Sequence, residues 1–404
     1  MTSVFTSPLQ TPPRVPPEVW LRIFCLAADL EDLLNCDNLL YPDFPRMLVK
    51  QYELQRLKDS LRTKRSVALV CRTWNELALE ILYQSILITR VDTLASLHET
   101  LQRHTLIAQG KNRLGWWTKR LDVLIDDERC ESSDYTMLAA LVRQLPNLSI
   151  VTLSMPMLPF NDCWLRQLPT SFMVSLTEAC EDLMMLLAAS PNLRVLRCPI
   201  CSPTPADRAS RSRLDVPVMS KLESITLMSV FLRDYLPRDK DANHLPALRQ
   251  LTYDCIPPPF FDHPWKNFVK LTCANLTSVT LDLSLPGESL QNEFDLLSEC
   301  CAVLDKLVIY LRSWLEFRPC LVLPPVSFLG LHSNAPKGLL FHHQALVSAL
   351  VTLTAPKLRT VRLLHANAAE QIRENASSFA AEDRTYLASC HFSLEDLKGR
   401  VLLP

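Results

Sequence analysis

The cysteines and histidines are the first residues to consider as a chemical centre. The chain holds 14 cysteines and 9 histidines, but only Cys198 and Cys201 have the C-x-x-C spacing that zinc sites and redox pairs use. A zinc site would need a second pair of ligands, and the next histidine downstream is His244. Because the cysteines are spread through apolar segments, we expect reduced thiols that pack as small hydrophobic side chains. No metal site is predicted.

Histidine and glycine spacing also argue against an enzyme. His342 and His343 are adjacent, and neighbours at i and i+1 on a helix do not face the same ligand. None of the six glycines belongs to a G-x-G-x-x-G, G-x-x-x-x-G-K-[ST] or G-x-S-x-G motif, and a phosphate-binding loop needs glycine where backbone amides approach the ligand. We therefore predict no catalytic residue, no cofactor and no enzyme activity, although a cysteine–histidine pair assembled by the fold stays open.

Composition limits the partners that the chain can have. Of its 404 residues, 48% are hydrophobic and 21% are charged, which is ordinary for a folded protein. The net charge is −1, so there is no basic surplus for nucleic acid. No apolar run approaches the ~20 residues that span a bilayer, and residues 1–13 lack the order of a signal peptide. We expect a cytoplasmic and/or nuclear protein without membrane association.

Two apolar helices are predicted near the N-terminus. Pro16 and Pro17 suit a helix start, and the apolar residues that follow form one broad helical face as far as residue 27. A second helix is predicted from Val67 through Leu79, and it leads into a β-prone stretch at 81–89.

These two segments resemble the F-box, the helical module that docks on the Skp-type adaptor of cullin-based ubiquitin ligases. The opening pattern of the family is L-P-x-E-v-x-x-x-I-F, and the closing pattern is V-C-[KR]-x-W-x-x-L-A. The first is matched by Pro16, Glu18, Val19, Ile23 and Phe24, with Val15 at the leucine position, and the second by Val70, Cys71, Arg72, Trp74, Leu77 and Ala78. The resemblance implies that adaptor binding uses Pro16, Glu18, Ile23, Phe24, Val70, Cys71 and Trp74.

One departure from the family concerns the residues between the two patterns. The family places about twenty residues between the proline and the closing valine, whereas Pro16 and Val70 are 54 positions apart. The extra material, about 29–65, begins acidic and ends basic, and its second half has helical spacing at Leu54, Leu57 and Leu61. We interpret it as an insertion, so shortening it should leave the fold and adaptor binding intact. A plain helical cap, with Phe24 and Trp74 as core residues only, is the alternative.

A leucine repeat follows. Leucine makes up 75 of the 404 residues, and the pattern L-x-x-L-x-L recurs in degenerate form with five of seven spacings between 26 and 29 residues. The copies begin at Leu121, Leu148, Leu193, Leu222, Leu248, Leu276, Leu304 and Leu358, and the first is the least regular. The period is typical of leucine-rich repeats. Helical spacing before several copies, ended by Pro-x-Leu, predicts alternating helix and strand.

The predicted fold is therefore α/β, with an N-terminal helical F-box-like module followed by a curved leucine-rich-repeat solenoid. Parallel strands would line its concave side and helices its convex side. We expect a disordered tail at 1–14, the module at 15–90 and the repeats at 91–404. A doubly wound α/β domain is the competing interpretation, but it has no reason to keep a 27-residue period.

The concave side is the predicted target surface. Residues between the buried strand positions face that side, and arginine and tyrosine are favoured there as interface anchors. We predict target contacts at Arg197, Lys306, Tyr310 and Arg362, with an acidic or phosphorylated segment as the ligand. The alternative surface is the proline-rich segments 201–218, 256–268 and 318–337, the second of which holds Phe260, Phe261, Trp265 and Phe268.

Together these patterns predict a substrate-recognition subunit of a cullin-based ubiquitin ligase. By the resemblance, its partners would be a Skp-type adaptor, through it a cullin scaffold, and a target protein of unknown identity. Such a subunit performs no bond chemistry; it raises the effective concentration of the target near the ubiquitin-carrying enzyme. The alternative is a leucine-rich-repeat interaction scaffold without ligase association.

Overall fold

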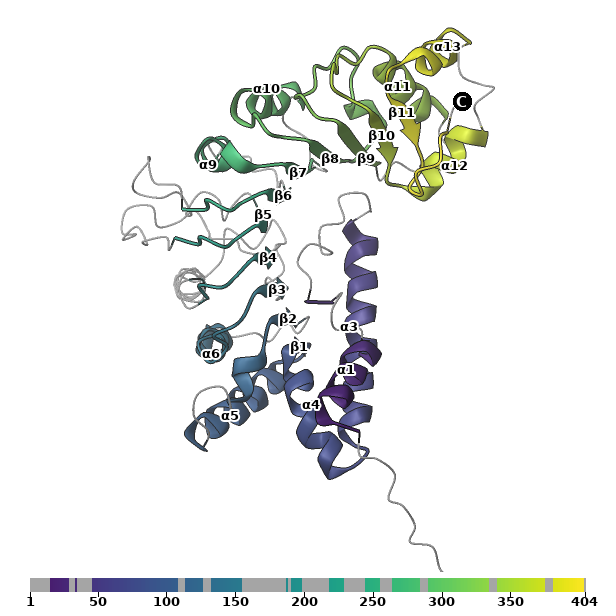
Figure 1. The fold of residues 1–404 in the computed structure, drawn as a ribbon. Coiled ribbons are helices and arrows are strands. Elements are labelled where there is room, and N and C mark those ends of the chain that lie inside the picture. The colour runs from purple at the N-terminus through teal and green to yellow at the C-terminus, as the bar shows by residue number, and fades with distance from the viewer. Residues whose placement is uncertain are drawn as a thin grey trace, which may run out of the picture.

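A computed structural model shows an arch of parallel strands with a helical module at its N-terminal end (Figure 1). The residues that the structure describes are 15–28, 33–34, 46–107, 113–125, 132–154, 187, 190–197, 218–228, 244–254, 264–283, 290–333, 340–374 and 381–402.

The strands of the described residues form one sheet of eleven parallel members, in which the order in space is the order in sequence. They are β1 (Ser85–Ile88), β2 (Arg120–Leu124), β3 (Ile150–Ser154), β4 (Val195–Arg197), β5 (Ser224–Met228), β6 (Gln250–Asp254), β7 (Ser278–Asp282), β8 (Lys306–Leu311), β9 (Phe328–Ser333), β10 (Thr360–Leu363) and β11 (Ser393–Glu395). A doubly wound domain reverses its strand order at a switch point. This sheet does not, so the fold is a solenoid.

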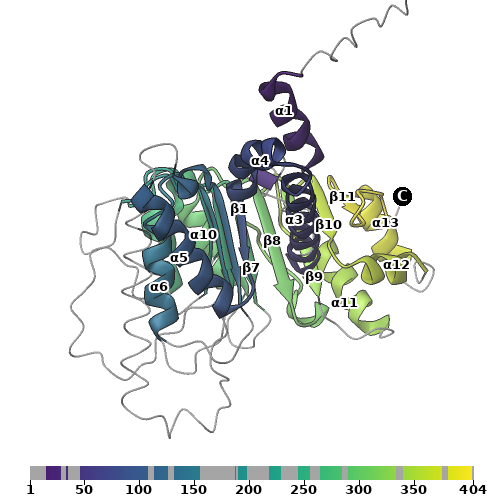
Figure 2. The same cartoon turned by 90° about the horizontal axis from the view of Figure 1, so that it is seen from below.

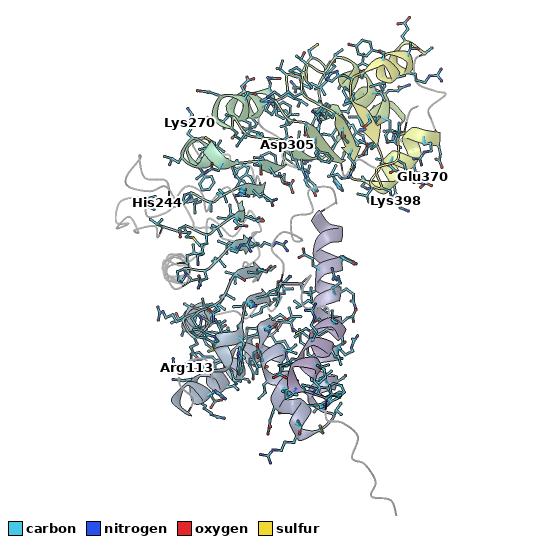
Figure 3. The ribbon with its side chains drawn as sticks, in the orientation of Figure 1. Arg113, His244, Lys270, Asp305, Glu370 and Lys398 are labelled. Carbon is cyan, nitrogen blue, oxygen red and sulfur yellow. The ribbon has the colours of Figure 1, made fainter. Side chains whose placement is uncertain are left out.

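Helices cover one side of the sheet. They are α5 (Val91–Ile107), α6 (Ser132–Val142), α9 (Pro264–Thr272), α10 (Leu290–Cys300), α11 (Leu340–Val351), α12 (Ala366–Glu374) and α13 (Ala381–Ser389). Seen from below, α5, α6 and α10 lie on one side of the strands and α3 (Arg46–Ala68) on the other (Figure 2). Arg113 and Lys270 lie along the outer, convex side (Figure 3). Among the described residues, no helix is long and apolar enough to cross a membrane.

The repeat leucines form the core between sheet and helices. Leu148, Val151 and Leu196 are fully buried, as the repeat predicts, and their equivalents in later strands belong to the same cluster. Seven of the eight predicted copies have the predicted register. The first does not: Leu121 pairs with Val151, so Leu121 takes the second apolar position and buried Thr118 the first.

The structure also contains a repeat that the sequence interpretation missed. The segment 318–337 was predicted to interrupt the solenoid, yet it holds β9, which joins β8 to β10. Val326, Leu329 and Leu331 are its buried positions. Valine replaces the first leucine there, directly after Pro324 and Pro325, and the 54-residue spacing that follows Leu304 is two ordinary repeats.

In the described part of the N-terminal module, three helices pack together. They are α1 (Pro17–Ala27), α3 and α4 (Arg72–Gln84), and α1 packs against both of the others. Trp20, Phe24 and Trp74 form an aromatic cluster, with 4.8 Å between the ring centroids of Trp74 and each partner. The module then runs directly into β1, so the sheet begins at Ser85, inside the predicted 15–90 module.

The predicted helix 67–79 is two helices. α3 ends at Ala68, and α4 begins at Arg72 with Cys71 as its N-cap. The Cys71 backbone is extended, and its sulfur accepts a hydrogen bond from the Trp74 amide at 3.4 Å. Because this cap begins a new helix, the apolar segment that we predicted as one continuous helix is divided into two.

Candidate protein-interaction surfaces

The first candidate surface is the outer face of α1. Val15, Val19, Ile23 and Leu26 keep between 43% and 60% of their surface exposed. Their spacing of four, four and three residues places them in one stripe, because such neighbours share a helix face. Phe24, one position after Ile23, points the other way and is 3% exposed. An apolar stripe left in water on a short helix is typical of a surface that a partner covers.

The turn between α3 and α4 adds two more exposed apolar residues. Leu69 is 74% exposed and Val70 is 60% exposed. The turn lies close to α1, because Trp74, two residues into α4, contacts both Trp20 and Phe24.

The structure divides the seven residues that the F-box resemblance assigns to the adaptor. Pro16, Glu18, Ile23, Val70 and Cys71 are exposed. Phe24 is buried and Trp74 is half-buried, both within the aromatic cluster. The last two therefore shape the module from inside, and direct contact by a partner falls to the five exposed residues.

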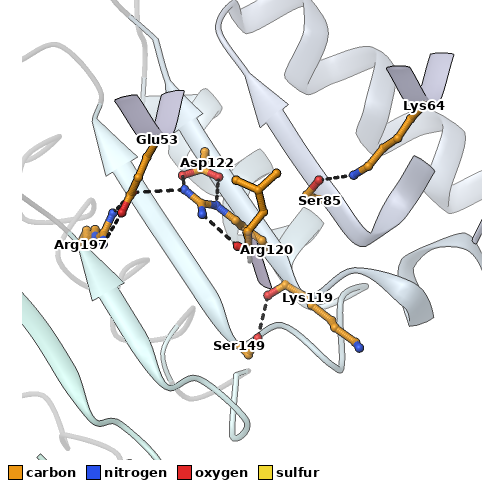
Figure 4. A network of polar contacts seen from close by, with 9 residues as sticks. Glu53, Lys64, Ser85, Lys119, Arg120, Asp122, Ser149 and Arg197 are labelled. Carbon is orange, nitrogen blue, oxygen red and sulfur yellow. Dashed lines mark hydrogen bonds and ion pairs between the residues drawn. The ribbon is translucent and has the colours of Figure 1, made fainter. Parts of the chain in front are cut away.

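The concave side of the sheet is the second candidate surface, and α3 lies over part of it. Glu53 of α3 is 5% exposed and binds Arg197 of β4, with Nη2 donating to Oε1 at 3.2 Å and Nη1 donating to Oε2 (Figure 4). Arg120 of β2 reaches Glu53 Oε2 at 3.6 Å. The residue predicted as a target anchor, Arg197, is thus engaged within the chain.

Arg120 is the centre of this network. Its Nε and Nη2 donate to the two carboxylate oxygens of Asp122 at 2.7 and 3.2 Å, and its Nη1 donates to the Leu33 carbonyl at 3.1 Å. Burial alone would lower the pKa of Arg120, but Asp122 and then Glu53 more than offset it, so the pKa is raised. A buried guanidinium with all its partners in place is rigid and stays charged.

Further along α3, the helix turns other buried groups inward. Leu57 is fully buried, and the Ser60 hydroxyl donates to the Ala28 carbonyl at 2.5 Å. Lys64 is 2% exposed and donates to the Ser85 hydroxyl at 2.5 Å. Burial lowers the pKa of Lys64 to about 7, with the nearby Arg120 charge adding to the effect and Cys25 opposing it. Residues 53–64 are therefore part of the packed molecule, whereas the sequence interpretation assigned them to an excursion.

The other three predicted target residues lie near the C-terminal end of the sheet. Arg362 donates to Glu395 at 2.8 Å and stacks over the Phe328 ring at 5.4 Å. Tyr310 is largely buried and lies 4.9 Å from the His332 ring. Lys306 is half-exposed at the start of β8. Arg197 and Arg362 lie on the same register line of the sheet, but each is already paired with a glutamate of this chain.

Few clusters could carry chemistry. Within the described ranges, no group of three or more His, Cys, Asp or Glu side chains could hold a metal ion; Cys198 and Cys201 lie outside those ranges. The Ser313 hydroxyl lies 2.7 Å from His342 Nδ1, but it also accepts from the Leu315 amide as a helix cap. Phe268 belongs to α9 and is buried, whereas Phe260 and Phe261 lie outside the described residues.

Comparison with known proteins shows a similarity to a solved structure, but no matching family. No family model and no curated protein matches the chain. Among solved structures, it is similar to the leucine-rich repeat-containing protein LegL7 from Legionella pneumophila, with 14% identity and a TM-score of 0.38 over 78% of this chain and 92% of that chain. The fold assignment therefore rests on the strand order and register of this chain.

Proposed function

We propose that the chain is a non-enzymatic receptor that joins two proteins. Its N-terminal module binds a Skp-type adaptor of a cullin-based ubiquitin ligase, and its solenoid binds the protein to be modified. The F-box-like patterns supply the identity of the first partner. A solenoid is suited to the second because its curved sheet offers an extended, rigid surface.

The observation that carries the proposal is the exposed apolar surface of the module. Ile23 and Val70 are two of the matched family positions, and both remain largely in water. Burying a side chain of this size on a partner stabilises a complex by about 1.5–3 kcal/mol. The module thus leaves hydrophobic side chains exposed at the positions that the resemblance assigns to adaptor docking.

The test uses two exposed positions, so that the fold survives. Ile23→Asp and Val70→Asp place a charge in the proposed interface, and each should weaken co-purification with a purified Skp-type adaptor by at least about tenfold. Val303→Asp is the matched control, because Val303 is 50% exposed in the turn between α10 and β8. All three variants should unfold within about 0.5 kcal/mol of the wild type.

Two results would count against this function. Undiminished adaptor binding by Ile23→Asp and Val70→Asp would remove the docking face, and failure of the wild-type chain to bind any Skp-type adaptor would remove the ligase. In the second case the solenoid would be an interaction scaffold without ligase association.

A further inference from the structure

The Glu53 contact fills a site that the sheet has already built. Arg120 is held by both oxygens of Asp122 and by the Leu33 carbonyl, and none of these partners comes from α3. Asp122 aligns with Thr152, which aligns with Arg197, so the second arginine stands two strands away on the same line. Two arginines of the sheet, of which Arg120 is held in place by Asp122, converge on one carboxylate, and this is the geometry of an anion-binding site.

The two partners of this contact differ in how much they depend on it. If Glu53 left, Arg120 would keep both oxygens of Asp122 and the Leu33 carbonyl, and the side chain of Arg197, which is 22% exposed, would lose the Glu53 carboxylate while remaining within reach of solvent. Glu53 would lose its charge-assisted bonds to both arginines. The sheet side therefore remains a formed site after opening, and the helix side supplies the removable group.

The anchoring of α3 is uneven along its length. Leu57, Ser60 and Lys64 hold its second half by burial and by bonds to Ala28 and Ser85. Toward the N-terminus, Glu53 makes the contact with the sheet, while its neighbour Tyr52 is 60% exposed. The end of a helix frays more readily than its middle, because its terminal backbone groups lack intrahelical hydrogen-bond partners.

We propose that residues 46–56 of α3 are a built-in ligand of the concave face, and that an acidic segment of a partner protein binds the same arginine site by displacing Glu53. The site then reads a carboxylate, because a carboxylate is what Arg197 and Arg120 hold in the closed state. In the free chain, residues 46–56 cover this part of the concave face. A partner can bind only when these residues move away from the sheet. The mechanism rests on the concave side being a binding face and does not require the ligase assignment.

The first measurement is hydrogen–deuterium exchange on the full chain. Glu53→Gln keeps the size of the side chain but removes the charge, and it should speed exchange of the amides in 46–58 by about tenfold while 60–84 stay protected. Asp59→Asn is the matched control: it removes one carboxylate from the same helix, but Asp59 is exposed and pairs with exposed Arg62. It should leave the exchange of 46–58 unchanged.

The second measurement is binding of a fluorescent hexaglutamate peptide at low ionic strength. Glu53→Gln should bind it about tenfold more tightly than the wild type or Asp59→Asn, and adding Arg197→Gln to Glu53→Gln should abolish the gain. Arg197→Gln removes the same ion pair by changing the sheet residue. Amide exchange of residues 46–58 should therefore also become faster in this variant, which keeps the test possible if Glu53→Gln fails to fold. Unchanged exchange in either variant, or a gain in peptide binding that survives Arg197→Gln, would overturn the proposal.

Discussion

The two candidate surfaces of this molecule differ in how far their side chains are already in contact with other parts of the chain. The outer face of α1 and the α3–α4 turn expose apolar side chains, so the burial of these side chains is incomplete within the chain. The concave face over β2–β4 holds buried charges that are all paired within the chain. Exposed apolar groups indicate a surface that a partner can cover, whereas a paired arginine indicates a site whose ligand is already supplied by the chain.

The largest effect that could break this comparison is expected from shortening residues 29–65 to a family-like connection. That change removes Leu57 from the core together with Glu53, Ser60 and Lys64. Replacing Leu57 alone with alanine should cost about 2–5 kcal/mol of unfolding free energy, so the deletion should abolish cooperative unfolding in urea. Leu69→Ala is the control, because Leu69 is exposed. A deletion variant that unfolds like the wild type would show that α3 is dispensable.

The next effect concerns Lys64 and pH. Its folded pKa of about 7 lies below the ordinary lysine value of 10.5, so the unfolded chain binds more protons between these two values. The contribution of Lys64 to the unfolding free energy therefore rises as pH increases from 7 toward 10.5. The size of the pKa shift limits this rise to about a few kcal/mol. Lys64→Met removes the titrating group.

Urea unfolding at several pH values checks this. The difference in unfolding free energy between wild type and Lys64→Met should move in favour of the wild type as pH increases from 7 to 10, because the other titrating groups are common to both. The mutation leaves the Ser85 hydroxyl without its lysine donor, so the change with pH, and not the absolute stability, is the readout. A difference that stays flat across this range would mean that Lys64 is charged and solvated in the folded chain.

The smallest effect should come from the far end of the concave side. Arg362 and Glu395 form a part-buried pair, so Arg362→Gln should cost about 1 kcal/mol of unfolding free energy. Because this pair is separate from the Glu53 network, exchange of the α3 amides should not change. Faster exchange in 46–58 upon Arg362→Gln would show that the two ends of the arch are coupled, and the contrast between a local closed site and an independent far end would fail.

Local pattern was enough to predict most of the solenoid. A leucine spacing of 26–29 residues reports one helix and one strand per unit, so the register of β3 to β8 and β10 follows from the sequence alone. The prediction failed where another residue type occupies a leucine position. Thr118 before β2 and Val326 before β9 are buried as the leucines are, but a search for leucine does not find them. The double-length spacing before Leu358 was the available sign of the second case.

The position of α3 over the concave face could not be predicted from local sequence patterns. Glu53 and Arg197 are 144 positions apart, and nothing in the spacing of either segment indicates that they meet. The sequence did show that Leu54, Leu57 and Leu61 share a helix face, which fits the inward face of α3, but not which surface covers that face. Similarly, the F-box patterns identified Phe24 and Trp74 as important without separating the residues that build the module from those left exposed.

The central claim is that the exposed face of the N-terminal module binds a Skp-type adaptor while the solenoid remains free for a target. The most direct test is hydrogen–deuterium exchange of the full chain with and without a purified Skp-type adaptor. The account predicts a stable complex, with protection confined to α1 and to residues 66–74 and none in β4 to β8. Absence of a complex, or protection along the concave strands instead of α1, would contradict it.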